Sequence, residues 1–281
     1  SSLIMGINAE FVKLVADLRS RKLLSGDSVV EIGAQDVSVA GEVVSKILAD
    51  DYFKVGHEKK INASNLHLHL GFTPYTAIDA SGGGGALVFD LNKDIREHYK
   101  YAESFDLVTN LGTAEHCFNQ YAVFKNLHDL CKPGGLIIHA LTAQGNVNHG
   151  FYNYHPRFVA DLSVANNYEI MDLSFTVDYK PDLIKYTKAS FQKWDSHDLL
   201  IYAVLRKKTN SPFCIPFDGM FSSANQLDDY AGTGLDPLVT EFSPYLKGGD
   251  WDNTRGIKNN KAPQVYNRLK VFLRRLFSGL S

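Results

Sequence analysis

The chain has 281 residues, of which 44% are hydrophobic and 21% are charged, the composition of an ordinary globular protein of one large domain or one domain with additions. Its formal net charge is −2 at pH 7, so a basic face is not expected and a nucleic-acid partner is disfavoured. No apolar run approaches the roughly 20 residues of a membrane span, so no transmembrane segment is expected. Cys117, Cys131 and Cys214 are far apart and odd in number, which argues against a disulfide framework or a zinc motif and favours a reducing, cytoplasmic setting.

Periodicity and turn signals predict helices that alternate with strands over most of the chain. The first helix, 8–24, places Phe11, Leu14 and Leu18 on one face at spacings of three and four. The predicted strands are 28–32, 74–79, 86–89, 105–110, 135–140, 168–175 and 199–205, and the other main helices are 37–48, 65–70, 121–130 and 157–166. This alternation is typical of a parallel sheet covered by helices on both faces.

The last quarter of the chain differs in character, and we expect a domain at 1–208 followed by an irregular extension at 209–281. The aromatic-rich stretch 212–230 is expected to pack along the sheet edge or, as an alternative, to cover the substrate as a lid. Residues 265–280 predict an amphipathic helix, for which core docking or a homodimer contact is favoured over a membrane surface. Its apolar stripe consists of Val265, Leu269, Phe272, Leu276 and Leu280.

Five short motifs follow one another in the predicted sheet. They are Val29-Val30-Glu31-Ile32-Gly33-Ala34, Ile78-Asp79, Phe89-Asp90-Leu91, Phe105-Asp106-Leu107-Val108-Thr109-Asn110 and Lys132-Pro133-Gly134-Gly135. A β-branched strand that ends in an acid and a glycine is how an open α/β sheet grips a nucleotide-type cofactor. Over about 28–207 this order resembles the class I S-adenosylmethionine-dependent methyltransferases. The resemblance implies S-adenosylmethionine as cofactor and an α/β fold, with a Rossmann-like, doubly wound, mostly parallel seven-stranded sheet whose last strand is antiparallel.

The resemblance also implies a role for each motif. Glu31 and Gly33 bracket the methionine part of the cofactor, Asp79 accepts hydrogen bonds from both ribose hydroxyls, and Asp90-Leu91 meets the adenine. An ionised carboxylate only accepts hydrogen bonds, and charge assistance makes them about twice as strong as neutral ones, so Asp79 suits a ribose diol. The full set expected to bind the cofactor is Glu31, Gly33, Ala34, Asp79, Ala80, Asp90, Leu91, Asn110 and Leu111.

Two stretches depart from the family pattern. Ala34, Gln35 and Asp36 stand where the family often has further glycines, which predicts a first loop of different shape. The glycine run 82–85 is expected to be a flexible surface connector, with a mobile flap beside the ribose as the alternative.

The acceptor is expected at the loops 111–116 and 142–156, because ligands of open α/β sheets bind beyond the carboxyl ends of the strands. His116 is the first candidate for a catalytic general base and His149 the second, because histidine titrates near neutrality. A supporting role for His116 beside Asn110 or the cofactor stays open. The residues expected to bind substrate are Glu115, Asn148, Tyr152 and His155. No metal is assigned, and a site made of His149, His155 and a carboxylate is a less favoured alternative because its spacing is not diagnostic.

The function expected from these features is transfer of a methyl group from S-adenosylmethionine to a small molecule, such as a hydroxyl of a sugar or related metabolite. A catalytically silent methyltransferase-like binding domain is an alternative. A nucleotide-dependent dehydrogenase is less favoured, because it requires Gly-x-Gly-x-x-Gly after the first strand and this chain has one glycine there.

Overall fold

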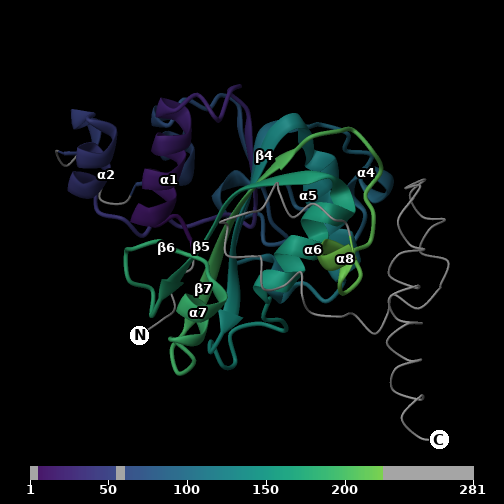
Figure 1. The fold of residues 1–281 in the computed structure, drawn as a ribbon. Coiled ribbons are helices and arrows are strands. Elements are labelled where there is room, and N and C mark those ends of the chain that lie inside the picture. The colour runs from purple at the N-terminus through teal and green to yellow at the C-terminus, as the bar shows by residue number, and fades with distance from the viewer. Residues whose placement is uncertain (1–5, 55–60, 224–281) are drawn as a thin grey trace, which may run out of the picture. The chain divides into compact units, whose positions relative to one another are not determined.

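The computed structural model describes residues 6–54 and 61–223. They form one seven-stranded sheet in the order β2-β1-β3-β4-β7-β5-β6 (Figure 1). The strands are β1 (Val29–Ile32), β2 (Tyr75–Ile78), β3 (Phe105–Leu111), β4 (Cys131–Gln144), β5 (Tyr168–Val177), β6 (Ile184–Lys185) and β7 (Leu199–Lys207). The predicted helix at 265–280, and any dimer contact through it, lie outside the described residues.

Parallel pairing joins β2, β1, β3 and β4, whereas β7 is antiparallel to both β4 and β5. The predicted mostly parallel sheet with an antiparallel last strand is therefore confirmed. One predicted strand, 86–89, is wrong, because its pairing with the sheet is limited to a single bridge between Ile78 and Leu87. The chain then turns away, since the Asp90 amide donates to the Tyr99 hydroxyl over 2.8 Å instead of to a strand. Strand β6 is missing from the prediction, because its two residues are too few to form a recognisable pattern.

Helices cover both faces of the sheet (Figure 1). The α-helices are α1 (Ala9–Ser20), α2 (Gly41–Leu48), α3 (Ala63–His69), α4 (Ile95–His98), α5 (Gln120–Leu130), α6 (Pro156–Asn166), α7 (Lys188–Gln192) and α8 (Met220–Ser223), and the 3₁₀ turns are η1 (Asp51–Phe53), η2 (Gly83–Gly85) and η3 (Ala114–His116). Successive residues of a strand point to opposite faces. Val29 accordingly packs in the core beneath α1 and α3, whereas Val30 and Ile32 pack in the core beneath α5 and α6.

The described residues after β7 pack along α6. Asn166 accepts from the Cys214 amide over 2.7 Å and donates to the Cys214 carbonyl over 3.0 Å. Asp161 accepts from the amides of Gly219 and Phe221 over 3.0 and 2.7 Å. This part of the stretch 212–230 therefore packs on helix α6 and not along the sheet edge that the sequence suggested. The division of the chain at residue 208 remains a prediction.

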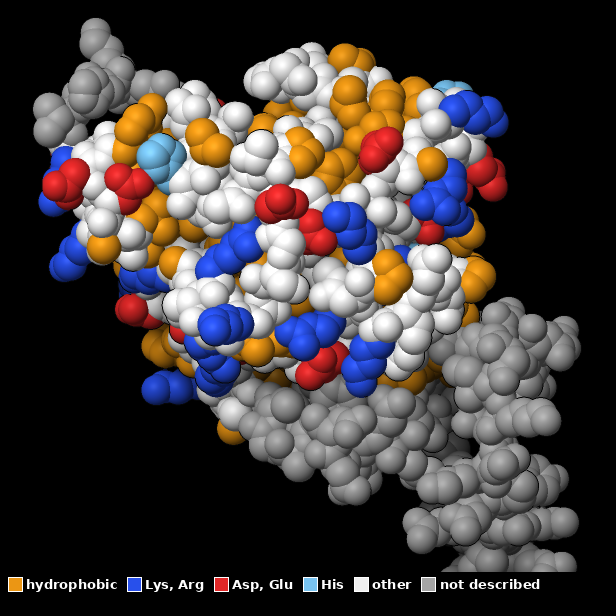
Figure 2. All heavy atoms as spheres, turned by 90° about the horizontal axis from the view of Figure 1, so that it is seen from above, with side chains coloured by type: hydrophobic (Ala, Val, Ile, Leu, Met, Phe, Trp, Pro, Cys, Tyr) orange, Lys and Arg blue, Asp and Glu red, His pale blue; other side chains and the backbone are white. Residues whose placement is uncertain are grey.

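The surface seen in Figure 2 mixes acidic, basic and hydrophobic side chains. Within the described residues, none of the helices combines the length and the apolar character that crossing a bilayer requires.

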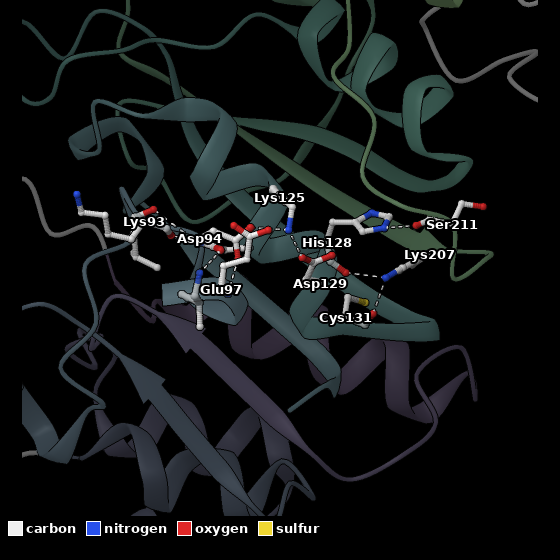
Figure 3. Close-up of polar contacts among 12 residues, drawn as sticks. Lys93, Asp94, Glu97, Lys125, His128, Asp129, Cys131, Lys207 and Ser211 are labelled. Atoms are coloured by element: carbon white, nitrogen blue, oxygen red, sulfur yellow. Dashed lines mark hydrogen bonds and ion pairs between the residues drawn. The ribbon is translucent and has the colours of Figure 1, made fainter. Parts of the chain in front are cut away.

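Two lysines, one half-buried and one buried, connect α5 to the elements beside it (Figure 3). Lys125 pairs with Asp94 over 2.7 Å and with Asp129 over 2.6 Å, which joins α4 to α5. Lys207, only 2% exposed, donates to the carbonyls of His128 and Cys131 over 2.7 and 2.9 Å. Burial lowers the pKa of Lys207, and the two carbonyls at the end of α5 compensate in part for the lost hydration.

We expect Lys207→Met to lower the free energy of unfolding by about 1–3 kcal/mol, because it leaves two buried carbonyls at the end of α5 without their donor. Chemical denaturation of the full chain measures this effect. Lys208→Met is the matched control, since Lys208 is exposed. Equal stabilities of the two variants would show that the buried Lys207 ammonium does not stabilise the contact between β7 and the end of α5.

Candidate active site

The carboxyl ends of β1 and β2 are linked by hydrogen bonds. The Gly33 amide donates to the Ile78 carbonyl over 2.7 Å, and the Ala34 amide donates to one Asp79 carboxylate oxygen over 3.0 Å. The other Asp79 oxygen accepts from the Ser81 amide over 2.7 Å. Burial by itself raises the pKa of Asp79, but the hydrogen bonds from Ser81 and Ala34 outweigh it, and the pKa lies below its usual value. Asp79 is thus an ionised acceptor at the strand tip, followed by the exposed Ala80.

Gly33 adopts a left-handed conformation with φ of +79°. The Thr113 hydroxyl donates to the Ile32 carbonyl over 2.8 Å, which brings the loop after β3 against the tip of β1. A Cβ atom on Gly33 would overlap with that hydroxyl group. Glycine is therefore required here by the approach of two protein loops as well as by the backbone conformation.

Glu31 is the acidic residue of the first motif. It follows Val29 on the same face of β1, so its side chain points toward α3 and is completely buried. One carboxylate oxygen is 2.7 Å from His67 Nε2, and the other accepts from the Tyr75 hydroxyl over 2.8 Å. Burial, and then the Glu31 charge, raise the pKa of Tyr75. Both Glu31 oxygens therefore have partners on α3 and β2. Its contact with the cofactor stays a prediction.

Asp90 remains at the carboxyl edge, half-buried, with one oxygen accepting from the Asn92 amide and side chain over 2.9 Å each. These two hydrogen bonds lower the pKa of Asp90. The side chain of the next residue, Leu91, is buried in the core beneath α5, so it does not present its side chain at this edge.

Asn110 and Leu111, both predicted to contact the cofactor, are buried at the end of β3, and their contact with the cofactor stays a prediction. Asn110 accepts from the Ala114 amide over 3.0 Å, and its Nδ2 lies 3.1 Å from Nδ1 of His139 on β4. Burial lowers the pKa of His139 to about 3, so the ring is neutral and Nδ1 accepts from Asn110. Asn110 therefore fixes the loop that follows β3.

Two residues that the sequence did not single out fix this loop. Gln120 donates to the carbonyls of Ala114 and Cys117 over 2.9 and 2.5 Å. Its side-chain oxygen accepts from the Tyr154 hydroxyl over 2.6 Å. Gln120 is the first residue of α5, and a glutamine there matches no sequence motif that would predict its contacts. Its partner Tyr154 is 34 positions away in the sequence.

Glu115, His116 and His149 come together beyond the ends of β3 and β4. One potential ligand atom from each residue lies within 4.8 Å of those from the other two. His149 Nε2 is 3.7 Å from Glu115 Oε1, and the two imidazole rings meet edge to face at 4.7 Å. Burial raises the pKa of Glu115 to about 7. Burial, and then His149, lower the pKa of His116.

Cys117 links this cluster to the acidic strand tips. Burial raises its pKa to about 11, with further contributions from the negative charges of Asp90, Glu115 and Asp79 in that order. The negative charges of Asp79, Asp90 and Glu115 therefore all act on the Cys117 thiol. The two parts of the candidate site are neighbours at one edge of the sheet.

The remaining predicted substrate residues lie around this cluster but not in it. Asn148 is exposed with φ of +65°, the Tyr152 hydroxyl donates to the Phe118 carbonyl over 3.0 Å, and His155 is exposed just before α6. The group of possible metal ligands found in the described chain contains His116, not His155, beside His149.

Residues 75–139 match a family model described as a methyltransferase domain. The match runs from β2 through Asp79, Asp90 and Glu115-His116 into β4, and so includes much of the edge described above. This stretch of the chain is a methyltransferase domain. The dehydrogenase alternative is set aside by the same match.

Several solved methyltransferase structures align with this chain at low sequence identity and low TM-score. TehB from Haemophilus influenzae is 13% identical with a TM-score of 0.41, over 69% of this chain and 61% of that chain. The N-methyltransferase NodS from Bradyrhizobium japonicum WM9 is 14% identical with a TM-score of 0.36, over 70% and 94%. The 1,6-didemethyltoxoflavin-N1-methyltransferase of Burkholderia thailandensis is 15% identical with a TM-score of 0.38, over 70% and 79%. No curated protein matches the chain in sequence.

We expect Gly33→Ala to destabilise this methyltransferase more than Gly85→Ala does. Both glycines have φ near +80°, but a Cβ on Gly33 would overlap with Thr113, whereas one on Gly85 meets nothing within 4 Å. The left-handed backbone costs roughly 1–2 kcal/mol in either variant, so the difference between them isolates the contact of the two loops. Thermal unfolding of both variants measures it, and equal losses would contradict the close approach.

Proposed function

We propose that this methyltransferase transfers the methyl group to a hydroxyl of a small, neutral, polyhydroxylated molecule such as a sugar. The observation that carries the proposal is the meeting of Glu115, His116 and His149 beside the acidic strand tips. The donor is held by Asp79 and Asp90, and the acceptor by the loops that follow β3 and β4.

The ribose of the donor is assigned to Asp79. Its carboxylate already fixes Ala34 and Ser81, and an ionised carboxylate has about four acceptor positions, so two remain for the ribose hydroxyls. The backbone of Gly33, which has no side chain, borders the same position. Asp90 is assigned to the adenine amino group.

The composition of the two acceptor loops supports a neutral substrate. Loops 112–119 and 142–155 contain no lysine or arginine, so they offer no guanidinium or ammonium group for a phosphate or carboxylate. They do contain exposed aromatic rings, with Phe118 and Phe151 76% and 68% exposed and 6.4 Å apart. Aromatic faces beside amides such as that of Asn148 suit a molecule with apolar C–H faces and many hydroxyls.

The proposed reaction is an in-line displacement. A lone pair of the acceptor oxygen forms the new bond to the methyl carbon, and the S–CH₃ bond breaks with its electron pair moving to sulfur. The products are a methyl ether, S-adenosylhomocysteine and the proton that the hydroxyl loses. Alignment of oxygen, carbon and sulfur can supply about 7–11 kcal/mol of the barrier reduction. Glu115, His116 and His149 are placed to assist loss of the proton.

We expect Asp79→Ala to weaken binding of S-adenosylhomocysteine by about 10- to 100-fold, because charge-assisted hydrogen bonds to the ribose are lost at roughly 1.5–3 kcal/mol each. Isothermal titration calorimetry measures the affinity, and thermal unfolding without ligand shows whether the fold survives. Asp27→Ala is the control, because Asp27 precedes β1 and lies at the opposite edge of the sheet. An unchanged affinity in folded Asp79→Ala would remove this residue from the donor site.

We expect labelled methyl groups to be transferred to neutral polyhydroxylated acceptors and not to their phosphorylated or carboxylated analogues. His116→Ala should lower turnover by about 100-fold or more and leave the S-adenosylhomocysteine affinity within about twofold, because this side chain serves the acceptor. His69→Ala, a histidine variant on α3, is the control. Transfer to nitrogen acceptors only, or full turnover without His116, would overturn the proposal.

A further inference from the structure

Three atoms of the cluster beside the donor site have no hydrogen-bond partner among the residues that the structure describes. They are both carboxylate oxygens of Glu115 and Nε2 of His149. The Glu115 side chain is 0% exposed, and within 6–54 and 61–223 no lysine or arginine forms an ion pair with it. A buried carboxylate without hydrogen bonds or a cation is costly, so the arrangement points to a bound species that supplies both.

We propose that Glu115, His116 and His149 bind one divalent transition-metal ion that holds two neighbouring oxygens of the acceptor. The donor set is two imidazole nitrogens and a carboxylate, which suits Zn²⁺, Fe²⁺ or Mn²⁺ better than Mg²⁺ or Ca²⁺. Such three-ligand sites leave positions open for other oxygens. The sequence-based alternative of His149 with His155 is replaced by His149 with His116.

The distances are compatible with one shared ion. Ligands of one ion lie about 2.0–2.2 Å from it and so are about 3–4 Å apart. His149 Nε2 and Glu115 Oε1 are already 3.7 Å apart, and all three ligand atoms are within 4.8 Å of one another. His116 is exposed, so its ring can rotate toward the other two without disturbing the core.

The backbone holds His149 close to Glu115. The Phe151 amide donates to the Glu115 carbonyl over 2.8 Å. Gly150 lies directly against Glu115, since a Cβ there would be 3.0 Å from the Glu115 carbonyl oxygen and 3.1 Å from its Cγ. The loop after β4 is thus fixed over η3, and the two histidines face each other across 33 positions of sequence.

This inference rests on the proposed function and gives the cluster a specific way to serve it. A bound ion would stabilise the negative charge on the acceptor oxygen and lower the pKa of its hydroxyl, so that the proton passes to solvent water while the imidazoles serve as ligands. Two open positions select acceptors with adjacent hydroxyls over those with one. Glu115 is the ligand that also gains a counter-ion for its buried charge.

The test is metal binding to the full chain after removal of metals with a chelator. Titration calorimetry with Zn²⁺ and with Mn²⁺ should show one site per chain, and bound metal should raise the unfolding temperature. Glu115→Gln and His116→Gln should each weaken binding by at least about 10- to 100-fold. His155→Gln, in the same loop region but outside the cluster, should retain wild-type metal affinity. Circular dichroism checks the fold of each variant.

The outcomes separate the two proposals. Absence of stoichiometric binding, or equal metal affinity in wild type and in folded His116→Gln, overturns the metal site. Full methyl transfer in the presence of a chelator overturns the metal's role and leaves the proposed function standing. Metal binding that depends on Glu115 and His116, with no transfer to any hydroxylated acceptor, supports the site and overturns the proposed function.

Discussion

The site depends on hydrogen bonds that fix the carboxyl ends of β1, β2 and β3 to one another. The amides of Gly33 and Ala34 bind the end of β2, and the Thr113 hydroxyl binds the end of β1. Backbone groups beyond the last strand pair have no ladder partner, so these contacts satisfy them. Because β1 lies between β2 and β3, one set of contacts orients both the proposed ribose acceptor Asp79 and the loop that carries Glu115 and His116.

Glu31 shows why the position of a residue in a motif does not decide its role. Side chains alternate along a strand, so Glu31 shares the face of Val29 and points toward α3. Its partners His67 and Tyr75 lie 36 and 44 positions away. The acid of the first motif here joins β1, β2 and α3. The alternation was visible in the sequence, but the partners were not.

The sheet could be predicted because buried β-branched strands and helices alternate along the chain. Strands of two residues or single bridges carry too little pattern, which explains both the missed β6 and the wrong strand at 86–89. The site was predictable to the level of loops, because strands β3 and β4 are neighbours and their following loops must meet. Which histidine joins His149 depends on the turn at η3, which Asn110 and Gln120 set through contacts that no local pattern shows.

The carboxylates at the amino and carboxyl ends of the strands differ in whether a lysine or arginine compensates their charge. At the amino edge, Asp106 pairs with Lys132 over 3.0 Å and accepts from Ser28 over 2.6 Å, so its charge is compensated within the fold. At the carboxyl edge, Asp79, Asp90 and Glu115 have no ion pair with any lysine or arginine of the described chain. Negative charge that the protein leaves uncompensated attracts cations. The sulfonium donor and the proposed metal ion are both cations, so the same edge suits both.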